Sequence, residues 1–171
     1  MKTIVFQLII LMTCCILSIS FYAEAKQINM ETLDSSVIKH IGTERLTVIF
    51  NAEKIASYRV DWTKGSTEKP KTMIGEYPVI EQGTALNKKQ SDMIKKLITS
   101  PASYGFGWTK RTLLRPSYAL RFMHDAEQVD ILIDTDSLQW GFSHKGTLSE
   151  QNISKDALPV LSKLLEKLFK K

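Results

Sequence analysis

Cysteine is nearly absent from this sequence. The 171 residues contain two, Cys14 and Cys15, and residues 26–171 contain none. A domain made from that part of the chain has no disulfide framework, no thiolate nucleophile and no thiolate ligands for zinc. An exported domain without disulfides fits a bacterial periplasm or exterior better than a eukaryotic secretory route.

Several sequence motifs that carry chemistry are also missing. No G-x-S-x-G segment occurs, which removes the usual nucleophile turn of serine hydrolases. The glycines at 105 and 107 lack both the spacing and the Lys-Ser/Thr pair of a phosphate-binding loop. There is no internal repeat and no low-complexity tract. A catalytic mechanism is therefore not indicated by motif, and we expect no cofactor.

The first 25 residues have the pattern of an export signal. Lys2 precedes an uncharged run from Ile4 to Tyr22, and the small-residue site Ala23-Glu24-Ala25 follows. This pattern predicts cleavage after Ala25, which leaves residues 26–171 as a single α+β domain in the periplasm or outside the cell. Two alternatives stay open: an uncleaved membrane anchor, and a lipoprotein whose Cys14 is lipidated.

The charge balance is basic. The chain holds 23 Lys and Arg against 18 Asp and Glu, a formal net charge of +5. A positive surface attracts anionic partners such as an acidic glycan or an acidic protein, although scattered lysines are also typical of a merely soluble protein. Export argues against a nucleic-acid partner.

Hydrophobic periodicity predicts helices and strands in the first hundred residues. Helices are expected over Thr32–Ile41, ending at Gly42, and over Asn87–Thr99, where Asn87 and Gln90 form a capping box. Strands are expected over Ile55–Trp62 and over Glu76–Ile80, which Pro78 restricts to a sheet edge. Arg45–Phe50 is ambiguous between the two types.

The second half of the chain is clearly β and then helical. Apolar residues alternate over Tyr118–Met123, Val129–Asp134 and Leu138–Ser143, which predicts an antiparallel meander of three strands. Leucines recur at three- and four-residue intervals from Leu158 to Phe169, which predicts an amphipathic helix that covers the sheet. The expected fold is α+β, an antiparallel sheet of four to five strands covered by amphipathic helices.

One aromatic and basic stretch is the candidate binding site. Three aromatics alternate with glycines and are followed by cations, an arrangement that suits stacking on sugar rings or contact with a protein. Core packing of the same aromatics is the alternative. The candidate residues are Tyr104, Phe106, Trp108, Lys110, Arg111 and Arg115.

The histidines and aspartates offer a second possibility. His124 and His144 are expected at the same end of the meander, with Asp125 nearby, where they suit a metal ion or a shared proton. Asp134-Thr135-Asp136 has the D-x-D pattern of a metal chelator, but aspartate is also a standard turn residue. These residues define the alternative function, a metal-dependent or hydrolytic enzyme.

The meander resembles a pattern in small exported bacterial proteins without a known activity. The similar residues are Arg115-Pro116-Ser117-Tyr118-Ala119-Leu120-Arg121-Phe122, then Val129–Ile133, and then Trp140-Gly141-Phe142. The resemblance extends from Leu113 to Phe169 and implies a hairpin before a C-terminal helix. Members of that group often carry one cysteine just before the first strand and another between the second and third. Thr112 and Ser137 stand near those places here, so this chain departs from the pattern.

Taken together, the sequence favours a non-enzymatic binding module that is inhibitor-like in character. The expected partner is an envelope protein or an acidic glycan. A membrane is involved only if the N-terminal segment stays attached or Cys14 is lipidated.

Overall fold

The structure is a computed structural model, and it describes residues 32–63, 72–107 and 112–170. Thr32–Lys171 forms one compact unit. Outside the described residues lie the predicted export signal with its expected cleavage site, and the candidate residues Trp108, Lys110 and Arg111. Within the described ranges, no helix combines the length and the apolar composition that a bilayer crossing requires.

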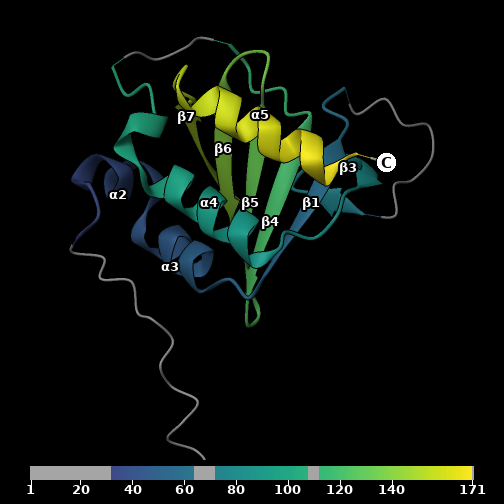
Figure 1. The fold of residues 1–171 in the computed structure, drawn as a ribbon, viewed down its shortest axis with the longest axis horizontal. Coiled ribbons are helices and arrows are strands. Elements are labelled where there is room, and N and C mark those ends of the chain that lie inside the picture. Colours follow the sequence, from purple (N-terminus) through teal and green to yellow (C-terminus); the bar gives the residue numbers. More distant parts are fainter. Residues whose placement is uncertain (1–31, 64–71, 108–111, 171) are drawn as a thin grey trace, which may run out of the picture. The chain divides into compact units, whose positions relative to one another are not determined.

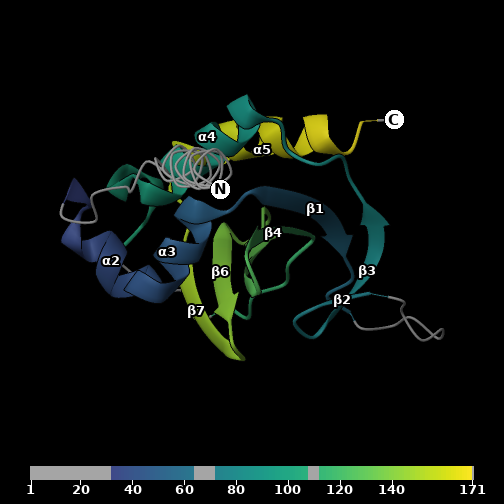
Figure 2. The ribbon, with the colours of Figure 1, turned by 90° about the horizontal axis from the view of Figure 1, so that it is seen from below.

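The described unit is an α+β fold with one curled, seven-stranded antiparallel sheet (Figure 1). The strand order is β2-β3-β1-β4-β5-β6-β7. In chain order the elements are α2 (Ser35–Ile41), α3 (Thr43–Asn51), β1 (Lys54–Val60), β2 (Met73–Ile74), β3 (Tyr77–Gln82), α4 (Lys88–Thr99), the 3-10 turn η3 (Pro101–Ser103), β4 (Tyr118–His124), β5 (Glu127–Asp134), β6 (Gln139–His144), β7 (Thr147–Asn152) and α5 (Ala157–Leu168). Figure 2 shows that the sheet bends away from α4 and α5, so that the strands form a half-barrel.

Helices α2 and α3 share a glycine. Asp34 caps α2 by accepting a hydrogen bond from the amide of Ser36, and Gly42 ends the helix with a φ of 90°. That positive φ suits glycine and turns the chain directly into α3. The ambiguous Arg45–Phe50 stretch is helical, because Leu46 and Ile49 lie three residues apart and are both fully buried.

The predicted helix over Asn87–Thr99 is confirmed as α4. Asn87 and Gln90 make the reciprocal capping box, with N–H···O distances of 3.0 and 2.9 Å. The Lys95 ammonium donates to the carbonyls of Phe50 and Ala52 at the end of α3. Burial lowers the pKa of Lys95, because the charged form is disfavoured away from water. These bonds join α4 to the C-terminal end of α3.

The edge position predicted for Pro78 is wrong. Strand β3 lies between β1 and β2, and Pro78 faces Met73 of β2. Proline is tolerated there because the residue opposite Pro78 on this side is Asp61, which lies beyond the end of β1 at Val60. The carbonyl of Pro78 still accepts a hydrogen bond from the amide of Asp61, 2.9 Å away.

The predicted meander is confirmed, and a fourth strand extends it. β4, β5 and β6 pair in order, and β7 adds to the outer side of β6. The expected total of four to five strands is too low, since β2 and β7 raise it to seven. β7 alternates little in hydrophobicity, because it reads Thr-Leu-Ser-Glu-Gln-Asn and its first residues are exposed.

The main core lies between the sheet and the helices. Trp140 is fully buried, with Phe122 and Phe142 beside it in the same layer of large side chains. From α5, Leu161, Leu164, Leu165 and Leu168 all point into this layer and are at most 3% exposed. The C-terminal helix therefore covers the sheet, as the leucine spacing predicts.

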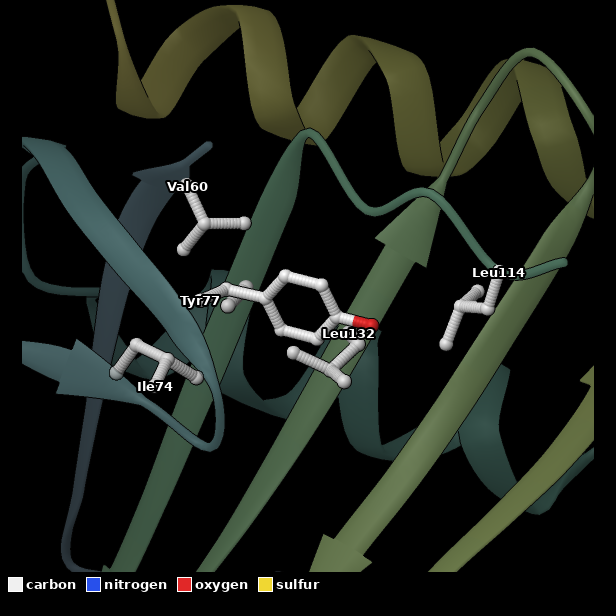
Figure 3. Packing of buried hydrophobic residues seen from close by; sticks show 6 residues of the cluster. Val60, Ile74, Tyr77, Leu114 and Leu132 are labelled. Carbon is white, nitrogen blue, oxygen red and sulfur yellow. The ribbon is translucent and has the colours of Figure 1, made fainter. Parts of the chain in front are cut away.

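A second apolar cluster fills the opposite face of the sheet (Figure 3). Its buried members are Val60, Ile74, Tyr77, Leu114, Ala119 and Leu132. Tyr77 and Ile74 come from the β2–β3 hairpin, which folds over the sheet toward Leu132 (Figure 3). β1 is consequently buried on both faces, so the half-buried strand predicted at this position is wrong in that respect.

Gly83 links the end of β3 to the C-terminus of α5, and its replacement by alanine is expected to destabilise the fold. A Cβ atom at Gly83 would lie 2.8 Å from the carbonyl oxygen of Leu168 and 2.5 Å from Ser57 Oγ. Because a backbone atom cannot move aside cheaply, Gly83→Ala should lower the free energy of unfolding by about 1–3 kcal/mol. Urea denaturation followed by far-ultraviolet circular dichroism measures this loss.

Gly107→Ala is the matched control for that experiment. A Cβ at Gly107 has no atom within 4 Å, so the same chemical change should alter the free energy of unfolding by less than about 0.5 kcal/mol. Equal effects of the two substitutions would contradict the close approach of α5 to Gly83.

Candidate functional site: a groove between two helices

A groove runs between α4 and α5 on the outer side of the helical layer. The two helices lie side by side in both views (Figures 1 and 2), and they are in contact. The groove has a volume of about 420 Å³. Its lining residues are Lys89, Gln90, Met93, Pro159, Val160, Lys163, Leu164 and Lys167.

The floor of the groove is apolar and partly accessible. Met93 is 37% exposed and Val160 is 41% exposed, whereas Leu164 at the base is 1% exposed. The apolar face of α4 includes Met93 and Ile94; Ile94 is buried, whereas Met93 reaches the surface. Large apolar side chains exposed together on two adjacent helices are typical of a contact surface.

The rim of the groove carries positive charge only. Lys89 lies on the α4 side, and Lys163 and Lys167 lie on the α5 side, one turn apart. The acidic residues of the two helices, Asp92 and Glu166, are not lining residues, and Asp92 pairs with Lys88 at 3.2 Å. The groove therefore combines an apolar floor with a cationic border.

The C-terminal end of α5 is held in place by the β3–α4 connection. The amide of Thr84 donates to the carbonyl of Leu168 at 3.0 Å, and the Ser57 hydroxyl donates to the carbonyl of Thr84. Arg59 lies over the ring of Phe169, with its Cζ 5.3 Å from the centroid. These contacts hold the C-terminal end of α5 against the sheet.

The structure places the described part of the aromatic candidate site largely inside the protein. Tyr104 is 7% exposed, stacks on Phe106 at 4.9 Å and contacts Trp140. Its hydroxyl donates to the carbonyl of Ile98, and burial raises its pKa well above the ordinary value. Phe106 is half-buried and stacks on His40 at 4.7 Å. An outward-pointing strip that includes Tyr104 is thus wrong, and the core alternative holds for that residue.

Arg115 lies apart from those rings. Its guanidinium stacks on Trp62, with Cζ 4.9 Å from the ring centroid, beside a cavity of about 310 Å³ that Asp136 also lines. Trp108, Lys110 and Arg111 belong to the undescribed part of the chain. The described members of the predicted binding strip therefore do not form one surface.

Asp134 acts as a turn residue. It is 3% exposed, and its carboxylate accepts hydrogen bonds from the amides of Arg115, Asp136 and Ser137 and from the Ser137 hydroxyl. Both of its oxygens are occupied by these donors, which leaves Asp134 poorly placed to hold a metal. The turn interpretation of Asp134-Thr135-Asp136 is confirmed.

The two meander histidines have different partners. His144 is 5% exposed, and its Nδ1 lies 2.8 Å from the carbonyl of Gln128. His124 is more accessible and lies near Glu53 and Asp125. Across the described ranges, the group of three potential metal ligands contains His124 but not His144.

The sequence contained part of the signal for the α4–α5 groove. The periodicity of both helices is visible, as are the lysines along the solvent side of α4. Periodicity does not predict that the two helices pack side by side on one face of the sheet. That pairing brings Met93 and Val160 together from positions 67 residues apart in the chain.

The comparisons with known proteins assign no family to this chain. No protein-family model, curated protein or solved structure matches the chain.

Proposed function

We propose that this protein is an exported, non-enzymatic binding module that docks an acidic amphipathic segment of a partner protein in the groove between α4 and α5. The observation that supports this proposal is the lysine-bordered apolar groove. The net charge of +5 adds a long-range attraction for such a partner.

The lining chemistry favours a protein segment over a glycan. Sugar rings stack on aromatic side chains, and none of the lining residues is aromatic. Methionine is flexible and packs against varied apolar surfaces, which suits a groove that receives side chains such as leucine. Lys89, Lys163 and Lys167 then lie where acidic residues on the flanks of the segment would meet them.

The dimensions suit a helical segment. α4 and α5 contain 12 residues each, so each is about 18 Å long at 1.5 Å per residue. A partner helix of about three turns fits along that length and presents apolar residues at three- and four-residue intervals to the floor. Glutamates on both sides of that stripe complete the match to the rim.

A peptide of stated composition tests the proposal. We expect a fluorescein-labelled amphipathic helix of leucine and glutamate to bind the protein in an anisotropy titration, and its leucine–lysine counterpart not to bind. K89E/K163E should weaken binding by about tenfold or more, because two attractive contacts become repulsive and 1.4 kcal/mol corresponds to a factor of ten. V160D should also weaken binding, since it places a carboxylate on the apolar floor.

K39E/K54E is the matched control for the charge reversal. It changes the net charge by the same amount on exposed lysines of α2 and β1, which do not line the groove. Its affinity for the acidic peptide should stay within about twofold. Equal losses in the two double variants would show general charge attraction in place of docking. Anionic lipid vesicles that bind while the acidic peptide does not would indicate a membrane surface as the partner.

A further inference from the structure

Glu53, His124 and Asp125 lie together beside the turn between β4 and β5, which is at the bottom of the sheet in Figure 1, and none of them lines the α4–α5 groove. Glu53 Oε1 lies 3.1 Å from His124 Nδ1, and Asp125 Oδ2 lies 3.6 Å from His124 Nε2. One ligand atom from each residue lies within 4.8 Å of the other two. The three side chains are accessible, with His124 31% exposed and both carboxylates more exposed still.

The backbone fixes these residues from two separate segments. Glu53 lies between α3 and β1, and its amide donates to the carbonyl of Met123 at 3.1 Å, which ties this linker to the end of β4. His124 is the last residue of β4 and pairs with Glu127 across the hairpin. Asp125 begins the two-residue turn with a φ of 50°, a conformation that aspartate adopts more readily than most residues.

The charges of the group are unbalanced. Among the described residues, both Glu53 and Asp125 form their ion pair with His124. An imidazole carries at most one positive charge and so cannot offset two carboxylates, and like charges this close disfavour each other. A bound divalent cation offsets both, and it also uses the lone pair of the imidazole.

We propose that Glu53, His124 and Asp125 form a zinc site that clips the α3–β1 linker to the β4–β5 hairpin. The ligands are one imidazole nitrogen and one oxygen from each carboxylate, with water in the remaining position. Imidazole and carboxylate ligands suit zinc, whereas Mg²⁺ and Ca²⁺ prefer oxygen ligands alone. Tetrahedral coordination at about 2.1 Å places ligand atoms about 3.4 Å apart. Glu53 and Asp125 lie beside different nitrogens of His124, so one of these exposed carboxylates has to rotate toward the nitrogen that binds the zinc.

His144 does not belong to this site. Its Nδ1 is engaged by the carbonyl of Gln128, and its Nε2 lies 3.6 Å from Glu127. The zinc site thus replaces the pairing of His124 and His144 expected from the strand order. It is also independent of the proposed peptide groove, since it shares no residue with it.

The experiment is a zinc titration of the untagged protein against a chromophoric zinc chelator at pH 7.5. We expect one zinc per chain, with no displacement by equimolar Mg²⁺. H124Q, E53Q and D125N should each weaken binding by about tenfold or more, because each removes one of three protein ligands. E44Q is the control; it removes an exposed carboxylate at the start of α3 and should leave the affinity unchanged.

The melting temperature with added zinc is a second, independent measurement of binding. Zinc binds the folded clip and should raise the melting temperature of the wild type with increasing concentration, but not that of E53Q. Retained affinity in H124Q would overturn the proposal. The proposal would also fail if H124Q lost zinc affinity while E53Q and D125N kept it, because zinc would then bind a single surface histidine. Equal competition by Mg²⁺ would also overturn it, as it would show unspecific attraction to carboxylates.

Discussion

A chain that stops before Ser154, and therefore lacks α5, is expected to lose its cooperative unfolding transition. Four leucines of α5 are buried against the sheet, and their burial contributes about 8 kcal/mol at about 2 kcal/mol each. Single domains are stable by about 5–15 kcal/mol, so this loss consumes most or all of the stability. Trp140 and Phe142 would then be uncovered. A thermal melt followed by circular dichroism should show a gradual slope without a transition.

A chain that stops after Phe169 is the control for the truncation. It keeps all of α5 and the contact of Arg59 with the Phe169 ring. Its melting temperature should match that of the full chain within about 2 °C, because Lys170 is an exposed residue beyond the helix. A shorter chain, ending before Ser154, that still melts cooperatively near the same temperature would contradict the role given to α5.

Trp140→Ala should lower the free energy of unfolding by about 3–5 kcal/mol, the range for large-to-small changes of aromatic residues in cores. The indole is fully buried, and its ring contacts Tyr104 at 4.9 Å and Phe142 at 5.5 Å between centroids. Neighbours in a sheet cannot collapse far into the space that it leaves. Urea denaturation should be followed by circular dichroism, since the substitution removes a fluorophore.

Trp62→Ala is the matched control for Trp140→Ala. Trp62 is 40% exposed and its ring carries Arg115 on one face, so its removal should cost about 1 kcal/mol or less. A loss at Trp62 as large as that at Trp140 would contradict the assignment of Trp140 to the core. A small loss at Trp140 would do the same.

The elements that periodicity predicts correctly are those with one strongly apolar face. The leucine stripe of α5 faces one partner surface, so its pattern follows directly from burial. The alternation from Tyr118 to His144 likewise places the largest side chains on the face that the helices cover, although Ala119 and Leu132 are buried on the other face. The capping box of α4 is equally local, because Asn87 and Gln90 contact each other within one turn. Local rules are sufficient where neighbours in sequence are also neighbours in space.

Strands whose burial comes from distant segments were not predictable in this way. Ala56 and Tyr58 of β1 alternate with Ile55 and Ser57, yet both faces are covered, because the β2–β3 hairpin folds over the side away from the helices. β7 has a polar sequence and is a strand because β6 provides a paired edge. In both places tertiary packing overrides local propensity.

The candidate sites also depend on contacts between distant parts of the chain, which the sequence alone does not show. The sequence suggested a cationic surface and a role for His124, and the structure gives each a neighbour from another part of the chain: α5 for the lysines of α4, and Glu53 for His124. The alternation of Tyr104 and Phe106 with glycines did not distinguish surface from core. The contact with Trp140 decides it for Tyr104, and that contact bridges 36 residues of sequence.

The outer strand β7 has a consequence for the behaviour of the protein at high concentration. A half-barrel has two edge strands, here β2 and β7. A strand of another molecule can pair with such an edge and begin aggregation. One edge, β2, is only two residues long. Along the other, Arg45 reaches the Thr147 carbonyl and side chain, and the Ser149 hydroxyl donates to the His40 carbonyl. An incoming strand would have to displace α2 and α3, so these short helices protect the open sheet from intermolecular pairing.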